Sequence, residues 1–134
     1  MIGRALGGLL AAILFAACAS TTPSSGSLKP GEVRLQTLPP ERGETPSACA
    51  AALLTGTLAR HPQSGIGLTG AGGKVLAVVW PFGWSARDDA GRLAIFDASG
   101  AIRGHEGSMV NVRGGFGGDE NTWIACGGIA GRGA

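Results

Sequence analysis

The run Lys74–Trp80 (Lys-Val-Leu-Ala-Val-Val-Trp) constrains the fold of this chain more than any other segment. It is rich in β-branched and aromatic residues, and Gly72, Gly73 and Pro81 bound it. A run of this length is too short for an ordinary helix, and its composition is typical of a buried strand. The sequence therefore predicts a buried β-strand here.

Several other short runs have strand composition. They are Leu53–Arg60, Ile66–Thr69, Arg92–Asp97, Ile102–Glu106, Met109–Arg113 and Thr122–Ala125. The stretches Asp88–Gly91 and Asp97–Gly100 place aspartate first and glycine fourth, as a type I turn prefers, and predict hairpin connections. Six or seven short strands predict an all-β fold, either a small antiparallel barrel or a compact sandwich.

The start of the chain has the layout of a removable export signal. Arg4 is its only charge, Ala5–Phe15 is apolar, and the small residues Ala16 and Ala17 precede Cys18. A transmembrane helix needs roughly 20 apolar residues, so this shorter run does not favour a permanent span. Residues 1–17 are therefore expected to form a signal peptide.

Phe15-Ala16-Ala17-Cys18 resembles the lipobox of bacterial lipoproteins, with Phe15 in place of the usual leucine. The resemblance implies that the Cys18 thiol is acylated, that Cys18 becomes the new N-terminus, and that its acyl chains hold the protein on a membrane. Ala19, rather than aspartate, comes next, which by the same resemblance implies the outer membrane in a cell that has one. An ordinary secretory signal cleaved near Ala17 or Ala19 is the alternative.

Residues 18–46 are rich in serine, threonine and proline and predict a lipid-anchored flexible linker. Within them, Val33–Leu38 alternates apolar and polar residues and could add a short strand. Residues 47–132 are expected to form the small β domain. Near the linker boundary, Thr45-Pro46 and Ala50–Ala52 could instead start a short helix, because proline suits a first helical position.

Three cysteines are present, and an odd thiol in an exported protein needs an explanation. Acylation of Cys18 supplies one and leaves Cys49 and Cys126 to pair in an oxidising compartment. A bridge between them would close a long loop and stabilise a small domain by about 4 to 5 kcal/mol in the chain-entropy model. The sequence therefore predicts a Cys49–Cys126 disulfide.

The stretch Val78–Arg87, the two predicted hairpins and Gly114-Gly115 are similar to small exported bacterial domains of unassigned function. The similarity covers roughly Thr55–Gly127. It implies a partly open barrel of the kind that binds short polymers, and no particular activity or ligand.

Trp80, Phe82 and Trp84 stand at alternate positions, so on an extended backbone their rings would share one face. An inward face would make them core residues. An outward face, with Arg87 nearby, would form a stacking platform for sugars or peptides. These four residues are therefore the candidate binding surface.

Other motifs do not match their usual context, so no cofactor or metal is predicted. Gly65–Gly70 has the spacing of a dinucleotide fingerprint, but a β-rich run follows it where a helix is required. Gly73-Lys74 lacks the other residues of a phosphate loop. Gly114–Asp119 matches the start of a single calcium-binding repeat, with Asn121 in place of the aliphatic core residue.

Two function classes follow. The favoured one is a non-enzymatic cell-envelope lipoprotein whose β module binds or inhibits a wall polymer or an envelope protein, with the membrane contacted through the lipid. The alternative is a small envelope hydrolase using His105 and Glu106, with Ser85 or Ser108 as nucleophile. A formal net charge of +2, with acids and bases interspersed, disfavours nucleic acid as a partner.

Overall fold

The computed structural model describes residues 27–40 and 52–130. These residues contain β-strands and no α-helix, which confirms the all-β prediction. The strands are β1 (Glu32–Val33), β2 (Ala52–His61), β3 (Gly65–Thr69), β4 (Val75–Val79), β5 (Ser85–Asp89), β6 (Arg92–Phe96), β7 (Ile102–His105), β8 (Met109–Phe116) and β9 (Thr122–Ala130). Every run predicted as a strand contributes to one of them.

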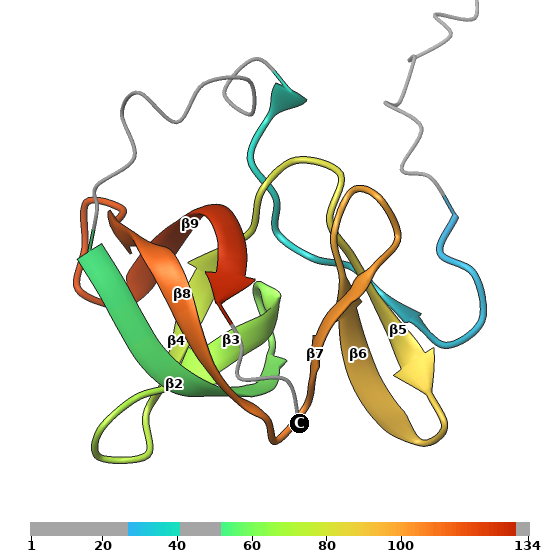
Figure 1. Ribbon diagram of the computed structural model, residues 1–134, viewed down its shortest axis with the longest axis horizontal. Helices are drawn as coiled ribbons and strands as arrows, with labels where there is room; N and C mark the ends of the chain where they lie inside the picture. Colours follow the sequence, from blue (N-terminus) through green and yellow to red (C-terminus); the bar gives the residue numbers. More distant parts are fainter. Residues whose placement is uncertain (1–26, 41–51, 131–134) are drawn as a thin grey trace, which may run out of the picture.

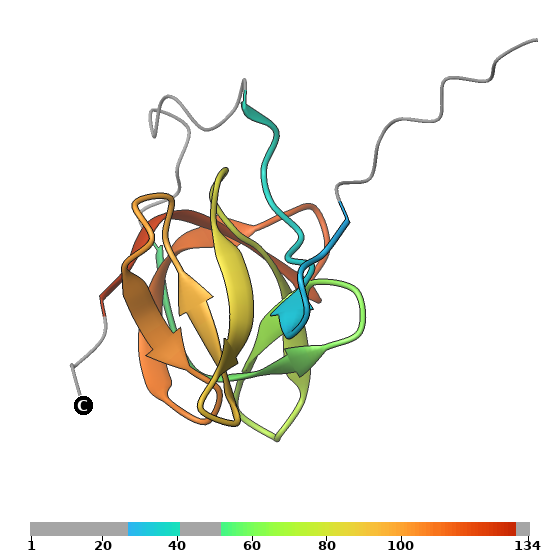
Figure 2. The same cartoon turned by 90° about the vertical axis from the view of Figure 1, so that its right-hand side faces the viewer.

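The strands form two sheets packed as a compact β sandwich (Figure 1). One sheet closes into a five-stranded barrel with the order β2-β3-β4-β9-β8, and the other has the order β1-β5-β6-β7. Figure 2 views the molecule from the side of the four-stranded sheet, with β1 at one edge of it. Both predicted architectures, barrel and sandwich, are thus present in one molecule.

One pair in the barrel is parallel. Strand β4 runs alongside β9 with Ala77 opposite Thr122 and Val79 opposite Ile124, and the other barrel pairs are antiparallel. A parallel pair needs a long crossover, and β5, β6, β7 and β8 all lie between β4 and β9 in the chain. The expected wholly antiparallel arrangement therefore needs correction at this pair.

A single hydrophobic core joins the two sheets. Leu58, Leu68 and Val78 fill the barrel, and Leu93 and Ile95 of β6 join the same cluster from the second sheet. Burial at about 25 cal/mol per Å² of apolar surface makes this shared core the main source of stability. The four-stranded sheet is consequently packed on the barrel and not separate from it.

Both predicted hairpins occur, with different turns. The Asp97–Gly100 turn has the expected hydrogen bond from Gly100 N to Asp97 O at 2.9 Å. The Ser99 hydroxyl, with the backbone N–H groups of Ala101 and Ser99, lowers the pKa of the Asp97 carboxyl. In the β5–β6 hairpin, Ala90 and Gly91 both have left-handed backbone angles, which is a type I′ turn and not type I.

The segment of residues 27–40, here called the β1 segment, packs against the domain although it lies within the predicted linker. Glu32 and Val33 pair with Arg87 and Ala86 of β5. Further along, Trp80 N donates to Gln36 O at 2.8 Å and Leu38 N donates to Trp80 O at 2.8 Å. The short strand that the alternation of Val33–Leu38 allowed is thus present at Glu32–Val33, and the segment touches both sheets.

Candidate functional site

The three predicted aromatic residues do not share one face. Trp80 is fully buried, and its indole Nε1 donates to Ile66 O at 2.9 Å. Phe82 is 51% exposed. The chain turns between them, with Trp84 N donating to Pro81 O at 3.3 Å and Gly83 at a φ of 82°. The alternation argument needs an extended backbone, which this turn interrupts.

Trp84 lies against the core and is half-buried. Its ring stacks on Trp80, with centroids 5.6 Å apart and an interplanar angle of 12°. Because Trp80 is held by burial and a hydrogen bond, this contact fixes the plane of the Trp84 ring. Trp80 and Trp84 therefore act together, with the first as support for the second.

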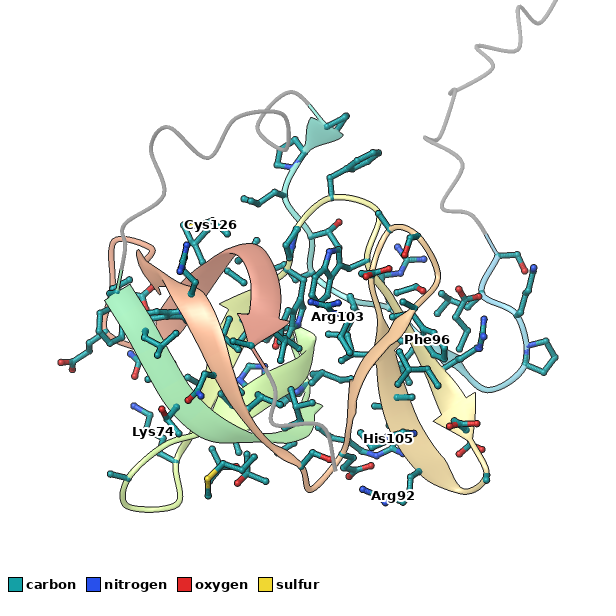
Figure 3. The ribbon with its side chains drawn as sticks, in the orientation of Figure 1. Lys74, Arg92, Phe96, Arg103, His105 and Cys126 are labelled. Atoms are coloured by element: carbon teal, nitrogen blue, oxygen red, sulfur yellow. The ribbon has the colours of Figure 1, made fainter. Side chains whose placement is uncertain are left out.

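Arg87 lies apart from the tryptophans, on the outer face of the second sheet. Its guanidinium carbon is 3.9 Å from the centre of the Phe96 ring, which Figure 3 places on that sheet. Ala86 beside it points into the core, and successive strand residues point to opposite faces. The four residues proposed as one platform are thus divided among the core, a turn and an outer face.

A cavity of about 320 Å³ opens where the β1 segment meets the start of β5. Its apolar lining comes from Leu28, Val33, Leu35 and Trp84, and its polar lining from Glu32, Arg34 and Ser85. Small-ligand sites are usually concave and combine apolar lining with a few polar groups that orient the ligand. Of the residues predicted as a binding surface, only Trp84 lines it.

The local sequence explains why this cavity forms. Val33 and Leu35 alternate with Glu32 and Arg34, and the two apolar side chains pack against the core. Gln36 N donates to Ser64 O at 3.1 Å, which holds the segment on the β2–β3 turn. The alternation is visible in the sequence but the cavity is not, because the opposite wall comes from a region about fifty residues away in the chain.

The histidines have other partners than those a hydrolase requires. His105 Nε2 lies 2.8 Å from Asp89 Oδ2, whereas Glu106 pairs with Arg60 at 3.2 Å. No serine or threonine hydroxyl of residues 27–40 and 52–130 forms a hydrogen bond with His105. His61 Nδ1 accepts from Gln63 N and Ser64 N in a turn. The described residues thus do not bring His105, Glu106 and a serine nucleophile together.

Figure 3 shows His105 and Arg92 at the same end of the second sheet. Arg92 Nη2 donates to the backbone oxygen of Glu106 at 3.1 Å, and the backbone N–H of Ser108 donates to His105 O. The other candidate nucleophile, Ser85, pairs with Phe96, whereas His105 pairs with Ala94. Arg92 and Ser108 thus hold the β7–β8 turn by contacts to its backbone.

The face that small polymer-binding barrels use has little to offer a charged polymer in this protein. In such five-stranded barrels the ligand lies across the second and third strands, here β3 and β4. Ile66, Leu68 and Val78 point into the core, and the alternate positions carry Gly67, Thr69, Val75, Ala77 and Val79, of which Gly67 and Ala77 are also buried. Single-stranded nucleic acids need aromatic rings and cations on this surface. The cavity beside Trp84 is therefore the better candidate site.

The glycine-rich motifs form strands and turns. Gly65–Gly70 runs along β3 into the turn before β4. In the β8–β9 loop, Asp119 accepts hydrogen bonds from Asn121 N and the Thr122 hydroxyl. Within the described part of the chain, no cluster of three or more histidine, cysteine, aspartate or glutamate side chains could hold a metal ion.

Two of the three cysteines, Cys18 and Cys49, lie outside the described residues, as do the predicted signal peptide and the possible helix near Ala50. Cys126 is half-buried in β9 and has an interaction partner. Figure 3 places it in the barrel sheet. No helix among the residues described is long and apolar enough to span a bilayer. The pairing of Cys126 with Cys49 stays a prediction.

Comparisons with protein-family models, with curated proteins and with solved structures gave no match.

Proposed function

We propose that this chain is a non-enzymatic cell-envelope lipoprotein whose β domain binds a component of the envelope. The observation that carries the proposal is the cavity beside Trp84, with an aromatic ring held in a fixed plane and three polar residues, Glu32, Arg34 and Ser85, in its lining. The component that the domain binds is a wall polymer, and inhibition of an envelope protein is the second form of the same proposal. The hydrolase alternative stays a prediction without a structural observation in its favour.

The anchoring part of the proposal rests on the sequence. Residues 1–17 form a signal peptide, Cys18 carries the acyl chains, and the protein is held on the outer membrane where the cell has one. A disulfide joins Cys49 to Cys126 across the domain. The β1 segment, which provides most of the cavity lining, is also the part of the chain that leads from Cys18 to the barrel.

Binding to the cell wall provides the test of function. We expect the full chain, extracted from its host in mild detergent, to bind purified insoluble wall polymer, and Trp84→Ala to weaken this binding at least tenfold. Truncation of a central aromatic anchor at a binding site has an effect of this size or larger. Co-sedimentation with the polymer, at a series of protein concentrations, measures the affinity.

Two further variants make the result interpretable. Phe82→Ala removes an exposed ring that does not line the cavity, so its binding should equal that of the wild type. Leu28→Ser changes a cavity residue that is 44% exposed, so it should weaken binding while leaving the melting temperature unchanged. Wild-type protein that stays in solution with the polymer, or Leu28→Ser protein that binds as wild type does, contradicts the proposal.

Peptide mapping of the native protein tests the anchor and the disulfide in one measurement. Without reduction, we expect an N-terminal peptide that begins at Cys18 and carries a diacylglyceryl mass, and a cross-linked pair of peptides that contain Cys49 and Cys126. Reduction should separate the pair and leave the N-terminal mass unchanged, because a thioether is not reduced. An unmodified N-terminus elsewhere, or a free Cys126 peptide, is the opposing result.

A further inference from the structure

Trp84 gives the cavity a rigid aromatic surface. Its ring stacks on Trp80, which is fully buried and hydrogen-bonded to Ile66 O at 2.9 Å, so the indole plane is set before any ligand arrives. The face of an aromatic ring carries partial negative charge and attracts the partial positive charge of C–H groups. A sugar ring presents such C–H groups on one face and hydroxyl groups around its edge. A fixed indole therefore suits a pyranose ring.

The polar lining suits the edge of the same ring. Ser85 offers a hydroxyl that both donates and accepts hydrogen bonds, and Glu32 offers a carboxylate. Glu32 Oε2 already accepts the backbone N–H of Lys29 at 2.8 Å, which holds the carboxylate in place. These groups can pair with the hydroxyl and acetamido groups of a sugar, which both donate and accept hydrogen bonds.

Arg34 adds a charge that selects the ligand further. It lines the cavity, and no carboxylate of residues 27–40 or 52–130 forms an ion pair with it. The ion pairs of the described residues involve Arg60, Arg103 or His105 instead. A guanidinium binds a carboxylate through two parallel hydrogen bonds, which gives direction as well as attraction. A ligand carboxylate would complete the pairing of Arg34.

We propose that the cavity binds a saccharide that carries a carboxylate, with the sugar ring on Trp84 and the carboxylate on Arg34. This inference rests on the proposed binding function and names the class of its ligand. A peptide with a free carboxylate would also satisfy Arg34. The flat indole and the hydroxyl-matching groups of Ser85 and Glu32 favour the saccharide.

Two sugars that differ by one acidic group test this assignment. N-acetylmuramic acid is N-acetylglucosamine with a lactyl ether that bears a carboxylate. Titrated into the full chain and followed by NMR at the Trp84 indole N–H, the acidic sugar should bind at least tenfold more tightly than the neutral one. The Arg34→Gln variant should bind both sugars equally, with the affinity that the wild type has for the neutral sugar.

Matched controls separate the site from general charge. Arg113→Gln removes an exposed arginine on β8, which does not line the cavity, and should keep the full preference for the acidic sugar. Trp84→Phe keeps an aromatic ring with a smaller face, so it should lower the affinity for both sugars by a similar factor. Because Arg34 is exposed, the melting temperature of Arg34→Gln should equal that of the wild type.

Several outcomes overturn the inference. If the wild type has equal affinity for the two sugars, Arg34 does not bind the ligand carboxylate. The same conclusion follows if Arg34→Gln still prefers the acidic sugar. If the dipeptide Ala-Ala binds more tightly than the acidic sugar, and if this binding depends on Arg34, the ligand is a peptide carboxylate. If the chain binds wall polymer but neither sugar, this inference fails and the proposed function stands. If wall polymer also stays unbound, both fail.

Discussion

Replacing Gly114 with alanine is expected to destabilise the domain by about 3 kcal/mol, because the added methyl group has no space. A Cβ at this position would lie 2.0 Å from Ile124 O and 2.8 Å from the indole Nε1 of Trp123. The first of these atoms belongs to the backbone of β9, so relief requires the two paired strands to separate. For a domain of this size the melting temperature should fall by roughly 10 to 20 °C.

Gly70→Ala is the matched control for this change. A Cβ at Gly70 would meet no atom within 4 Å, and its backbone does not have a left-handed φ. Its melting temperature should therefore stay close to that of the wild type. Gly67→Ala should behave like Gly114→Ala, since its Cβ would lie 2.2 Å from Leu76 O. Thermal unfolding followed by circular dichroism measures all three, and a Gly114→Ala midpoint equal to that of Gly70→Ala contradicts the clash.

Gly114 illustrates what the sequence alone could not reveal. The run Gly114–Asp119 matches only the start of a calcium-binding repeat, and the structure places Gly114 inside β8. The register of β8 on β9 shifts between Val112 and Gly114, where the strand bends to close the barrel. The glycine is needed because β9 passes close to its Cα, and that approach depends on a pairing that local sequence patterns do not encode.

Strand β5 was missed for a related reason. Its sequence, Ser85–Asp89, has charged residues at three positions and only Ala86 buried, so it shows no apolar alternation. It is a strand because it pairs with β6 on one side and β1 on the other. The runs with dense apolar character, such as Val75–Val79 and Arg92–Phe96, were predicted correctly because burial alone specifies them.

The candidate site was predictable only in part. The sequence singles out Trp84 by its residue type and by its alternation with Trp80 and Phe82, although a turn interrupts that alternation in the structure. Glu32 and Arg34 were not singled out, because their importance comes from the packing of the β1 segment on β5. The alternation of Val33–Leu38 was the one signal for that packing, and it does not specify which strand the segment joins. A site that combines two segments distant in the sequence can be recognised only once the tertiary structure is known.

The second large effect is expected from Trp80→Ala, which should destabilise the domain by about 4 kcal/mol. Trp80 has no exposed surface, stacks on Trp84 and donates a hydrogen bond to Ile66 O. Its loss leaves a large cavity and removes one hydrogen bond to Ile66 O, which still accepts the Ser64 hydroxyl. A small domain has a total stability of about 5 to 15 kcal/mol, so the variant should be close to the limit of folding. Urea unfolding of the full chain measures the change.

Variants of the nearby aromatic residues give unfolding free energies with which that of Trp80→Ala can be compared. Phe82→Ala removes a ring that is 51% exposed and should cost less than about 1 kcal/mol. The loss of unfolding free energy in Trp84→Ala should lie between those of Trp80→Ala and Phe82→Ala, because Trp84 is half-buried. An unfolding free energy for Trp80→Ala equal to that of Phe82→Ala would show that the indole is not the central element of the core.

Trp80→Phe separates the role of Trp80 in stability from its role in binding. A phenyl ring fills much of the space but cannot donate to Ile66 O, so the variant should fold with reduced stability. The smaller phenyl ring, without its hydrogen bond, would give the Trp84 ring less stacking surface and a less firmly held partner. If that support matters for binding, the folded Trp80→Phe protein should bind wall polymer more weakly than the wild type although Trp80 lines no part of the cavity. Unchanged binding would mean that the β1 segment alone holds Trp84 in position.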